Sequence, residues 1–293
     1  MKVSTFCTGS VIFLSLGHPS FAQPSGSSSV RIVVEEQGWG NGRPQDIQKV
    51  LESAAAELLR YFPERRIPLI RVAHAVDCPR ILYERGKDGE YIIQLSANDQ
   101  YWAQYAYQFA HELCHLLSNY DRSFENRKGP ENGWFDESLC ELASMFVVRK
   151  MAETWETNPP YDNWRSFAPE LRRYADDLLA NTEKIPANMS LAQWLARNLD
   201  SLRKDPVLRA KNAVVAAALL PLFQQRPESW EAVSWLNLAK GDDANSFERY
   251  VADWHYSCPK KCRPAVQEIA KRLSVDLTKN ATPRNAPFPP DRQ

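Results

Sequence analysis

The segment FAHELCHLL, residues 109–117, contains two histidines and a glutamate whose types and spacing could hold a metal ion and activate water. In a helix, His111 and His115 lie one turn apart on a single face, and Glu112 is offset so that it can reach a water between them. Imidazole nitrogens are common zinc ligands, and a carboxylate beside a zinc-bound water is a general base. The spacing therefore predicts a zinc site for hydrolysis.

The two histidines need a third protein ligand, because a catalytic zinc takes three and keeps its fourth position for water. The acidic candidates downstream of the motif are Asp121, Glu125, Glu131, Glu137 and Glu141. Glu137 opens a predicted helix after a long polar loop, so this second helix can place a carboxylate beside the first. Glu125 and Glu131 lie within the loop itself, where a ligand is poorly held. These considerations favour Glu137.

HELCH, followed after the polar loop by WFDESLCELAS, resembles the gluzincin-type zinc metallopeptidases, the group of thermolysin. Their pattern is HExxH and then a helix that begins W-x-x-E-G-x-A-E. By matching positions, the resemblance implies that zinc binds to His111, His115 and Glu137. It makes Glu112 the catalytic base. It also implies that Glu141, one turn after Glu137, accepts a hydrogen bond from a ligand histidine.

A second zinc pattern fits the same segment less well. The metzincins have HExxHxxGxxH, sometimes ending in Asp, and Asp121 keeps that spacing here. Ser118 stands where that pattern needs a glycine to turn the chain, a backbone role that serine fills poorly. The gluzincin resemblance has one departure of its own, since Ser138 replaces a glycine, and it covers residues 90–150. We expect Glu137 to be the third ligand and keep Asp121 as the alternative.

The chain before the motif predicts a strand that leads into the motif helix. Residues 81–84 and 90–96 are apolar arms joined by the turn-forming segment RGKDG, which indicates a hairpin. A helix then runs from Asn98 or Asp99 to Leu117 and carries the motif. The arm at 90–96 is a natural edge for an extended peptide substrate, and it could equally be an interior strand.

The remaining elements extend this pattern to an α+β fold class, in which a small zincin-like sheet and the active-site helices precede an all-helical region. Upstream, strands at 30–35 and 67–75 flank a helix at 44–62. Downstream, the apolar spacing predicts helices at 134–155, 169–180, 191–202, 207–223, 229–239, 246–256 and 263–273. The predicted organisation is a signal peptide at 1–22, a linker at 23–29, a catalytic region at 30–158, a helical region at 159–273 and a disordered tail at 274–293.

The overall charge is balanced, with 36 basic and 36 acidic residues, so the chain lacks the positive field that binds nucleic acid. The first residues combine an early Lys2, an apolar run at 11–16 and small residues before a cleavage point after Ala22, which is typical of a secretory signal peptide. That run is too short to cross a bilayer, and no later stretch is long enough. We expect a secreted or periplasmic protein without a membrane span in the mature chain.

Five of the six cysteines lie beyond the predicted leader. Cys258 and Cys262 flank Pro-Lys-Lys between two predicted helices, and an oxidising compartment favours a disulfide between them. Cys114 and Cys140 occupy positions where the gluzincin pattern has small residues facing each other, so we expect either a disulfide or two buried thiols. We expect neither to bind zinc, because Cys114 projects about 100° away from His115 on a helix.

The predicted function is zinc-dependent hydrolysis of peptide bonds in a peptide or protein substrate. The alternative from another class is a non-catalytic zinc-bound scaffold of the same fold that binds a peptide or a cell-wall component. Catalysis also needs an oxyanion donor. The downstream candidates Tyr250, His255 and Tyr256 leave this role unassigned. The sequence specifies neither the substrate sequence nor the oligomeric state.

Overall fold

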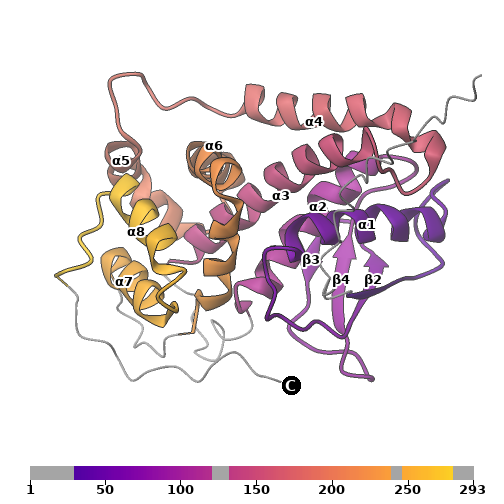
Figure 1. Cartoon of the computed structure of the whole chain (residues 1–293), viewed down its shortest axis with the longest axis horizontal. Helices are drawn as coiled ribbons and strands as arrows, with labels where there is room; N and C mark the ends of the chain where they lie inside the picture. Colours follow the sequence, from indigo (N-terminus) through magenta and orange to yellow (C-terminus); the bar gives the residue numbers. More distant parts are fainter. Residues whose placement is uncertain (1–29, 121–131, 239–245, 280–293) are drawn as a thin grey trace, which may run out of the picture.

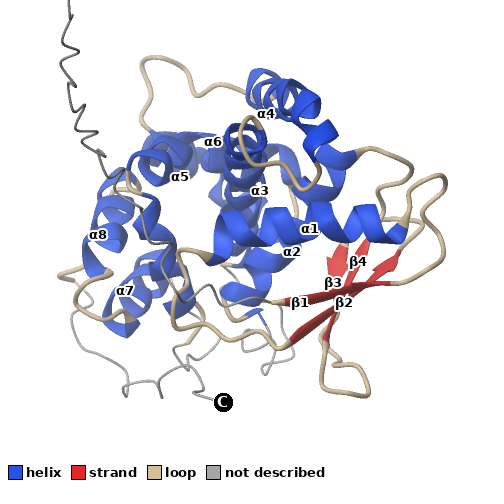
Figure 2. Cartoon of the chain, turned by 45° about the vertical axis from the view of Figure 1, so that its right-hand side comes forward, coloured by secondary structure: helices blue, strands red, loops and turns tan. Residues whose placement is uncertain are grey.

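The computed structural model describes residues 30–120, 132–238 and 246–279. In these residues the chain has a mixed α/β fold that is mostly helical, with one four-stranded sheet at one side of the molecule (Figure 1, Figure 2). A small sheet followed by helices agrees with the expected fold class. Outside the described residues lie the predicted leader and linker, residues 280–293 of the predicted tail, and the acidic residues Asp121, Glu125 and Glu131.

The sheet has the strand order β1-β2-β4-β3. β1 (Arg31–Val34), β2 (Leu69–His74) and β4 (Tyr91–Leu95) run parallel, and β3 (Arg80–Ile81) runs antiparallel to β4. The expected hairpin is therefore formed by β3 and β4. Of the two roles considered for the arm at 90–96, the structure has the interior one, because β4 is hydrogen-bonded to β2 on one side and to β3 on the other. The outer position next to β4 belongs to β3.

The helix α1 (Pro44–Leu59) makes the crossover that two parallel strands require. Its side chains at helical spacing, among them Ile47, Val50 and Leu51, are fully buried. A proline at the start suits a helix N-terminus, where the missing N–H group would have no partner within the helix. α1 packs on β1 and on the motif helix, so the sheet and that helix are held in one core.

The motif helix α2 (Trp102–Leu117) and the next helix α3 (Gly133–Trp155) pack along each other in the middle of the molecule (Figure 1). α3 is buried around most of its circumference, so it must be covered on several sides. α1, α2, α4 (Ala168–Asn181) and α6 (Arg209–Gln225) all pack against it. Glu137 lies near the start of α3, on the side that meets α2.

The other helical elements are η2 (Asp162–Phe167), α5 (Leu191–Lys204), η3 (Pro227–Trp235), α7 (Phe247–Ser257) and α8 (Arg263–Arg272). The segment expected as an α-helix at 229–239 forms η3, which is a tighter 3-10 helix. One buried cluster runs from Ile32 to Val275, so both halves of the described chain share a core. The predicted boundary after residue 158 falls between α3 and η2, and the division into two regions stays a prediction. No helix in the described ranges is both long and apolar enough to cross a membrane.

The disulfide predicted between Cys258 and Cys262 is not formed in the structure, where both are free and buried thiols. Cys258 follows the last residue of α7, and Cys262 precedes the first residue of α8. The Sγ atom of Cys258 lies 3.8 Å from the carbonyl oxygen of Ala232, so this thiol points into the core against η3. The short separation of Cys258 and Cys262 in the sequence does not indicate where the thiol of Cys258 points.

Phe146 tests how far the two halves depend on one core. Its ring on α3 lies 6.0 Å from the ring of Tyr61 and 5.4 Å from the ring of Trp230, measured between centroids. We expect Phe146→Ala to lower the free energy of unfolding by about 3–5 kcal/mol, because it removes a buried aromatic side chain and leaves a cavity. Denaturant unfolding would measure this. The control is Val76→Ala, at a side chain that is 96% exposed, which should change stability by less than about 0.5 kcal/mol. Similar stability losses in both variants would contradict the prediction.

Candidate metal centre

The predicted ligands on α2 and α3 come together in the structure. His111 and His115 lie on one face of α2, with ring centroids 5.0 Å apart. Glu137, the fifth residue of α3, contacts both rings: its Oε2 atom is 3.2 Å from Nε2 of His111, and its Oε1 atom is 3.5 Å from Nε2 of His115. Both Nε2 atoms therefore face the same carboxylate.

The opposite ring nitrogens of the two histidines face other carboxylates. Nδ1 of His115 is 2.8 Å from Oδ2 of Asp136, and Nδ1 of His111 is 3.9 Å from Oε2 of Glu141. If a metal were bound at the Nε2 atoms on the Glu137 side, the hydrogen of each ring would be on Nδ1, where Asp136 is placed to accept it from His115. Glu141 lies near His111, but 3.9 Å is too long for the hydrogen bond that the gluzincin resemblance implied. Asp136 was not singled out from the sequence, and its position directly before Glu137 was the available signal.

Glu112, the second residue of the HExxH motif, is buried, with 4% of its surface exposed. Burial raises the pKa of this carboxyl, and the neighbouring His111 and His115 and the backbone N–H of Ile81 oppose the rise without cancelling it. The contact with Ile81 places Glu112 beside β3, the outer strand of the hairpin. A buried carboxylate with a raised pKa is a stronger base than an exposed one.

Glu141 is buried with its charge partly compensated. The hydroxyl of Tyr107 donates a hydrogen bond to its Oε1 atom, and Nε of Arg209 lies 3.8 Å from its Oε2 atom. Arg209 also lies over the ring of Tyr107, with 5.0 Å between the guanidinium carbon and the ring centroid. Tyr107 precedes His111 by one helical turn on the same face, so helical spacing could have indicated it. Arg209 begins α6 and had no local signal.

The two cysteines beside the ligands are free, buried thiols, so the structure has the second of the two expected states. Sγ of Cys114 lies 3.7 Å from the carbonyl oxygen of Leu139. Cys140 differs from the expectation, because its Sγ atom and ring nitrogens of His111 and His115 all lie within 4.8 Å of one another. These three residues form a second possible donor set, in which Cys140 takes the place of Glu137.

Charge favours Glu137 over Cys140 as the third donor. Burial raises the pKa of Glu137, but the hydrogen bond from His111 and the nearby His115 outweigh it, so the pKa is lowered overall. Burial and the neighbouring Cys114 raise the pKa of the Cys140 thiol well above its ordinary value. Metals bind the carboxylate and the thiolate, not the thiol. Two imidazoles and one carboxylate are also a donor set that suits catalytic zinc.

The three candidates for the oxyanion role occupy different places. His255 faces α8, where its Nε2 atom is 3.2 Å from Nε2 of Gln267, and burial lowers its pKa. The ring of Tyr256 packs against the ring of His255. Tyr250 donates a hydrogen bond to Asn237, whose amide group lies beside Asp136. Of the three, Tyr250 is the one whose contacts lead to the metal centre.

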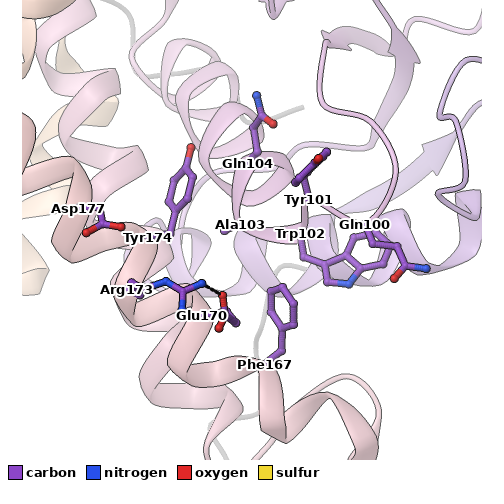
Figure 3. A pocket seen from close by; sticks show the side chains of 10 residues that line it. All are labelled: Gln100, Tyr101, Trp102, Ala103, Gln104, Phe167, Glu170, Arg173, Tyr174 and Asp177. Atoms are coloured by element: carbon purple, nitrogen blue, oxygen red, sulfur yellow. Dashed lines mark hydrogen bonds and ion pairs between the residues drawn. The ribbon is translucent and has the colours of Figure 1, made fainter.

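A separate pocket of about 260 Å³ lies at the start of α2 (Figure 3). It is lined by Gln100, Tyr101, Trp102, Ala103, Gln104, Phe167, Glu170, Arg173, Tyr174 and Asp177. None of these is a predicted site residue. Gln104 precedes His111 by two helical turns, which places it about 10 Å away along the helix axis. The pocket is therefore distinct from the metal centre.

Comparisons of the chain with models of protein families, with curated proteins and with solved structures found no match. The chemistry of the site must therefore be argued from its own residues. Two histidines, Glu137 and Glu112 converge between α2 and α3, which is an arrangement that can hold a divalent metal and move a proton beside it.

Asp136 tests the geometry of the centre. We expect Asp136→Ala to lower zinc affinity about 10–100-fold, because His115 loses the carboxylate that orients its ring. Competition with a chromophoric chelator would measure the affinity. The matched control is Asp176→Ala on α4, which removes an exposed carboxylate that pairs with Arg149. Unchanged zinc affinity in Asp136→Ala would contradict the arrangement described above.

Proposed function

We propose that this protein is a secreted or periplasmic zinc-dependent peptidase of gluzincin type. Its zinc ligands are His111, His115 and Glu137, and its general base is Glu112. The observation that carries the proposal is that the Nε2 atoms of two histidines on α2 face one carboxylate on α3, at 3.2 and 3.5 Å. Three nitrogen and oxygen donors leave a fourth position for water, as catalytic zinc requires.

The roles of the protein residues follow from their placement. A bound zinc ion would lower the pKa of a water molecule and polarise the carbonyl group of a substrate. Glu112 is within the motif helix beside both ligand histidines, so its carboxylate can accept the proton of the attacking water and then donate it to the leaving amine. Asp136 is placed to hold the ring of His115 in one orientation through Nδ1, and the carboxylate of Glu141 lies 3.9 Å from Nδ1 of His111.

The outer edge of the sheet supports a peptide as the substrate. Leu82 donates its N–H group to the carbonyl oxygen of Ile92 at 2.9 Å, so the N–H of Ile81 points away from β4. That outward N–H donates a hydrogen bond to Glu112, so it marks where the general base lies along this edge and is not free to pair with a peptide. An extended peptide aligned along the outer edge of β3 would pass the general base. The edge-pairing role considered for the arm at 90–96 thus moves to β3.

One observation favours the alternative of a non-catalytic zinc-bound scaffold. If Cys140 joined His111, His115 and Glu137, four protein ligands would close the coordination shell. A closed shell has no position for the attacking water, and the centre would then be structural. The two functions therefore differ in whether the sulfur of Cys140 binds the metal.

Glu112→Gln tests the proposed chemistry. The substitution keeps the shape of the side chain and removes its ability to accept a proton, so we expect one equivalent of zinc and a loss of peptide cleavage of about 10²–10⁴-fold. Metal analysis and digestion of a mixed peptide library would measure the two quantities. Glu183→Gln, at an exposed position in the described chain, should change neither. Undiminished cleavage by Glu112→Gln would refute the mechanism.

Cys140→Ala separates the peptidase from the scaffold. The peptidase should keep its zinc and its cleavage activity, because Cys140 is not a ligand there. The scaffold should lose zinc affinity, because one of its four ligands is removed. Cys114→Ala is the matched control, since it removes the other buried thiol between α2 and α3. A full equivalent of zinc without cleavage in the unmodified protein would favour the scaffold.

A further inference from the structure

Asn237 lies in the segment after η3 and uses its side-chain amide to join three parts of the chain. Its Nδ2 atom donates to the carbonyl oxygen of Ser118 at 3.0 Å and lies 3.4 Å from Oδ1 of Asp136. Its Oδ1 atom accepts a hydrogen bond of 2.8 Å from the hydroxyl of Tyr250. The end of α2, the first turn of α3 and the first turn of α7 therefore meet at one side chain.

The backbone of Asn237 also adopts an unusual conformation. Asn237 has a φ angle of 59°, in the left-handed region that non-glycine residues rarely adopt. Asn119, just after α2, has a φ angle of 62° and donates from its Nδ2 atom to the carbonyl oxygens of Ser234 and Leu236, at 2.9 and 2.8 Å. Two asparagines thus bind the end of α2 and the segment 234–237 to each other. Such conformations persist only where surrounding contacts hold them.

The contact between Asn237 and Asp136 does more than join α2 to segment 234–237. Oδ2 of Asp136 faces Nδ1 of His115 at 2.8 Å, and Oδ1 faces the amide of Asn237. A carboxylate held at both oxygens has one orientation, whereas a carboxylate held at one oxygen can rotate. The orientation of Asp136 decides where the ring of His115 points, and hence where its Nε2 atom lies.

Tyr250 supports Asn237 from α7. Burial, with smaller contributions from Asp136 and Cys140, raises the pKa of Tyr250 well above its ordinary value, so the hydroxyl stays a neutral donor. Its hydrogen bond occupies the Oδ1 atom of Asn237, which turns the Nδ2 atom toward Asp136 and Ser118. The contact from α7 therefore reaches His115 through two intermediate side chains.

We propose that Asn237 is a positioning residue for the metal centre, through which the C-terminal helices hold Asp136 and fix the ring of His115. The inference rests on the proposed metal site. It deepens that proposal, because it makes zinc affinity depend on a segment 101 residues away from Asp136 in the chain. A purely structural role for Asn237 would instead change stability without changing the metal site.

The test compares two glycine substitutions in the full chain. Glycine adopts a left-handed φ without strain, so Asn237→Gly and Asn119→Gly each remove a side chain and leave the backbone conformation accessible. Asn119→Gly breaks the binding of α2 to segment 234–237 without touching Asp136. Each variant would be measured for zinc affinity by chelator competition, for the visible spectrum of bound Co²⁺, and for thermal unfolding without metal.

We expect Asn237→Gly to lower zinc affinity about tenfold and to change the Co²⁺ spectrum, because His115 is no longer held in one orientation. Tyr250→Phe should produce a smaller change in the same direction. Asn119→Gly should keep the affinity and the spectrum of the unmodified protein even if it unfolds at a lower temperature. Wild-type affinity and spectrum in Asn237→Gly, or equal losses in both glycine variants, would overturn the proposal.

The same measurements separate this inference from the proposed function. An unmodified protein that binds no stoichiometric zinc would overturn both. An unmodified protein that binds zinc and cleaves peptides, with an Asn237→Gly variant that binds zinc equally well, would overturn the positioning role alone.

Discussion

The contact between the first turn of α3 and the histidine face of α2 is the constraint on which the rest of the structure depends. It brings the carboxylates of Asp136 and Glu137 next to two imidazole rings, beside the buried carboxylate of Glu112 on α2 itself. Burial acts to lower the pKa of His115, but Asp136, Glu137 and Glu112 outweigh this effect and raise it to about 10. The carboxylates thus stabilise positive charge at this place. A divalent metal ion bound to Nε2 would supply that charge in place of the proton, so metal binding would release protons.

Features with a local signature could be predicted from the sequence, and contacts between distant segments could not. The spacing of His111 and His115 required one helical face, and Glu137 followed from the start of the next helix. Asn237 and Arg209 reach the centre from far along the chain, and no periodicity marks a polar residue that acts by one hydrogen bond. The parallel neighbour of β4, which is β2, was equally hidden, because alternation of side chains describes the faces of a strand and not the strands beside it. Cys258 is a further example, because its short separation from Cys262 in the sequence does not show which way its thiol points.

The burial of α3 explains why a site built from α2 and α3 needs the C-terminal helices. A helix that is apolar on most of its circumference cannot face water on the side away from α2, so α4 and α6 cover it. α6 also reaches the part of α3 that carries Glu137, because Oγ of Ser138 lies 3.3 Å from Oδ1 of Asn212. Rigid support of this kind is what a metal ligand requires, because a small displacement of one donor changes the coordination geometry.

The burial of Glu112 supports the proposed catalytic centre over the structural alternative. A structural zinc site is complete once its ligands are bound, and it gains nothing from a further carboxylate that is not a ligand. Placing that carboxylate in the interior costs free energy, because desolvation disfavours its charged form and raises its pKa. Natural proteins keep such unfavourable groups mainly at functional sites. Glu112 lies between the ligand histidines and the outward N–H of Ile81, the place where a proton acceptor would meet both an activated water and an extended peptide. Under the proposed function this position has a role, because hydrolysis needs a proton acceptor there, whereas a structural metal site does not.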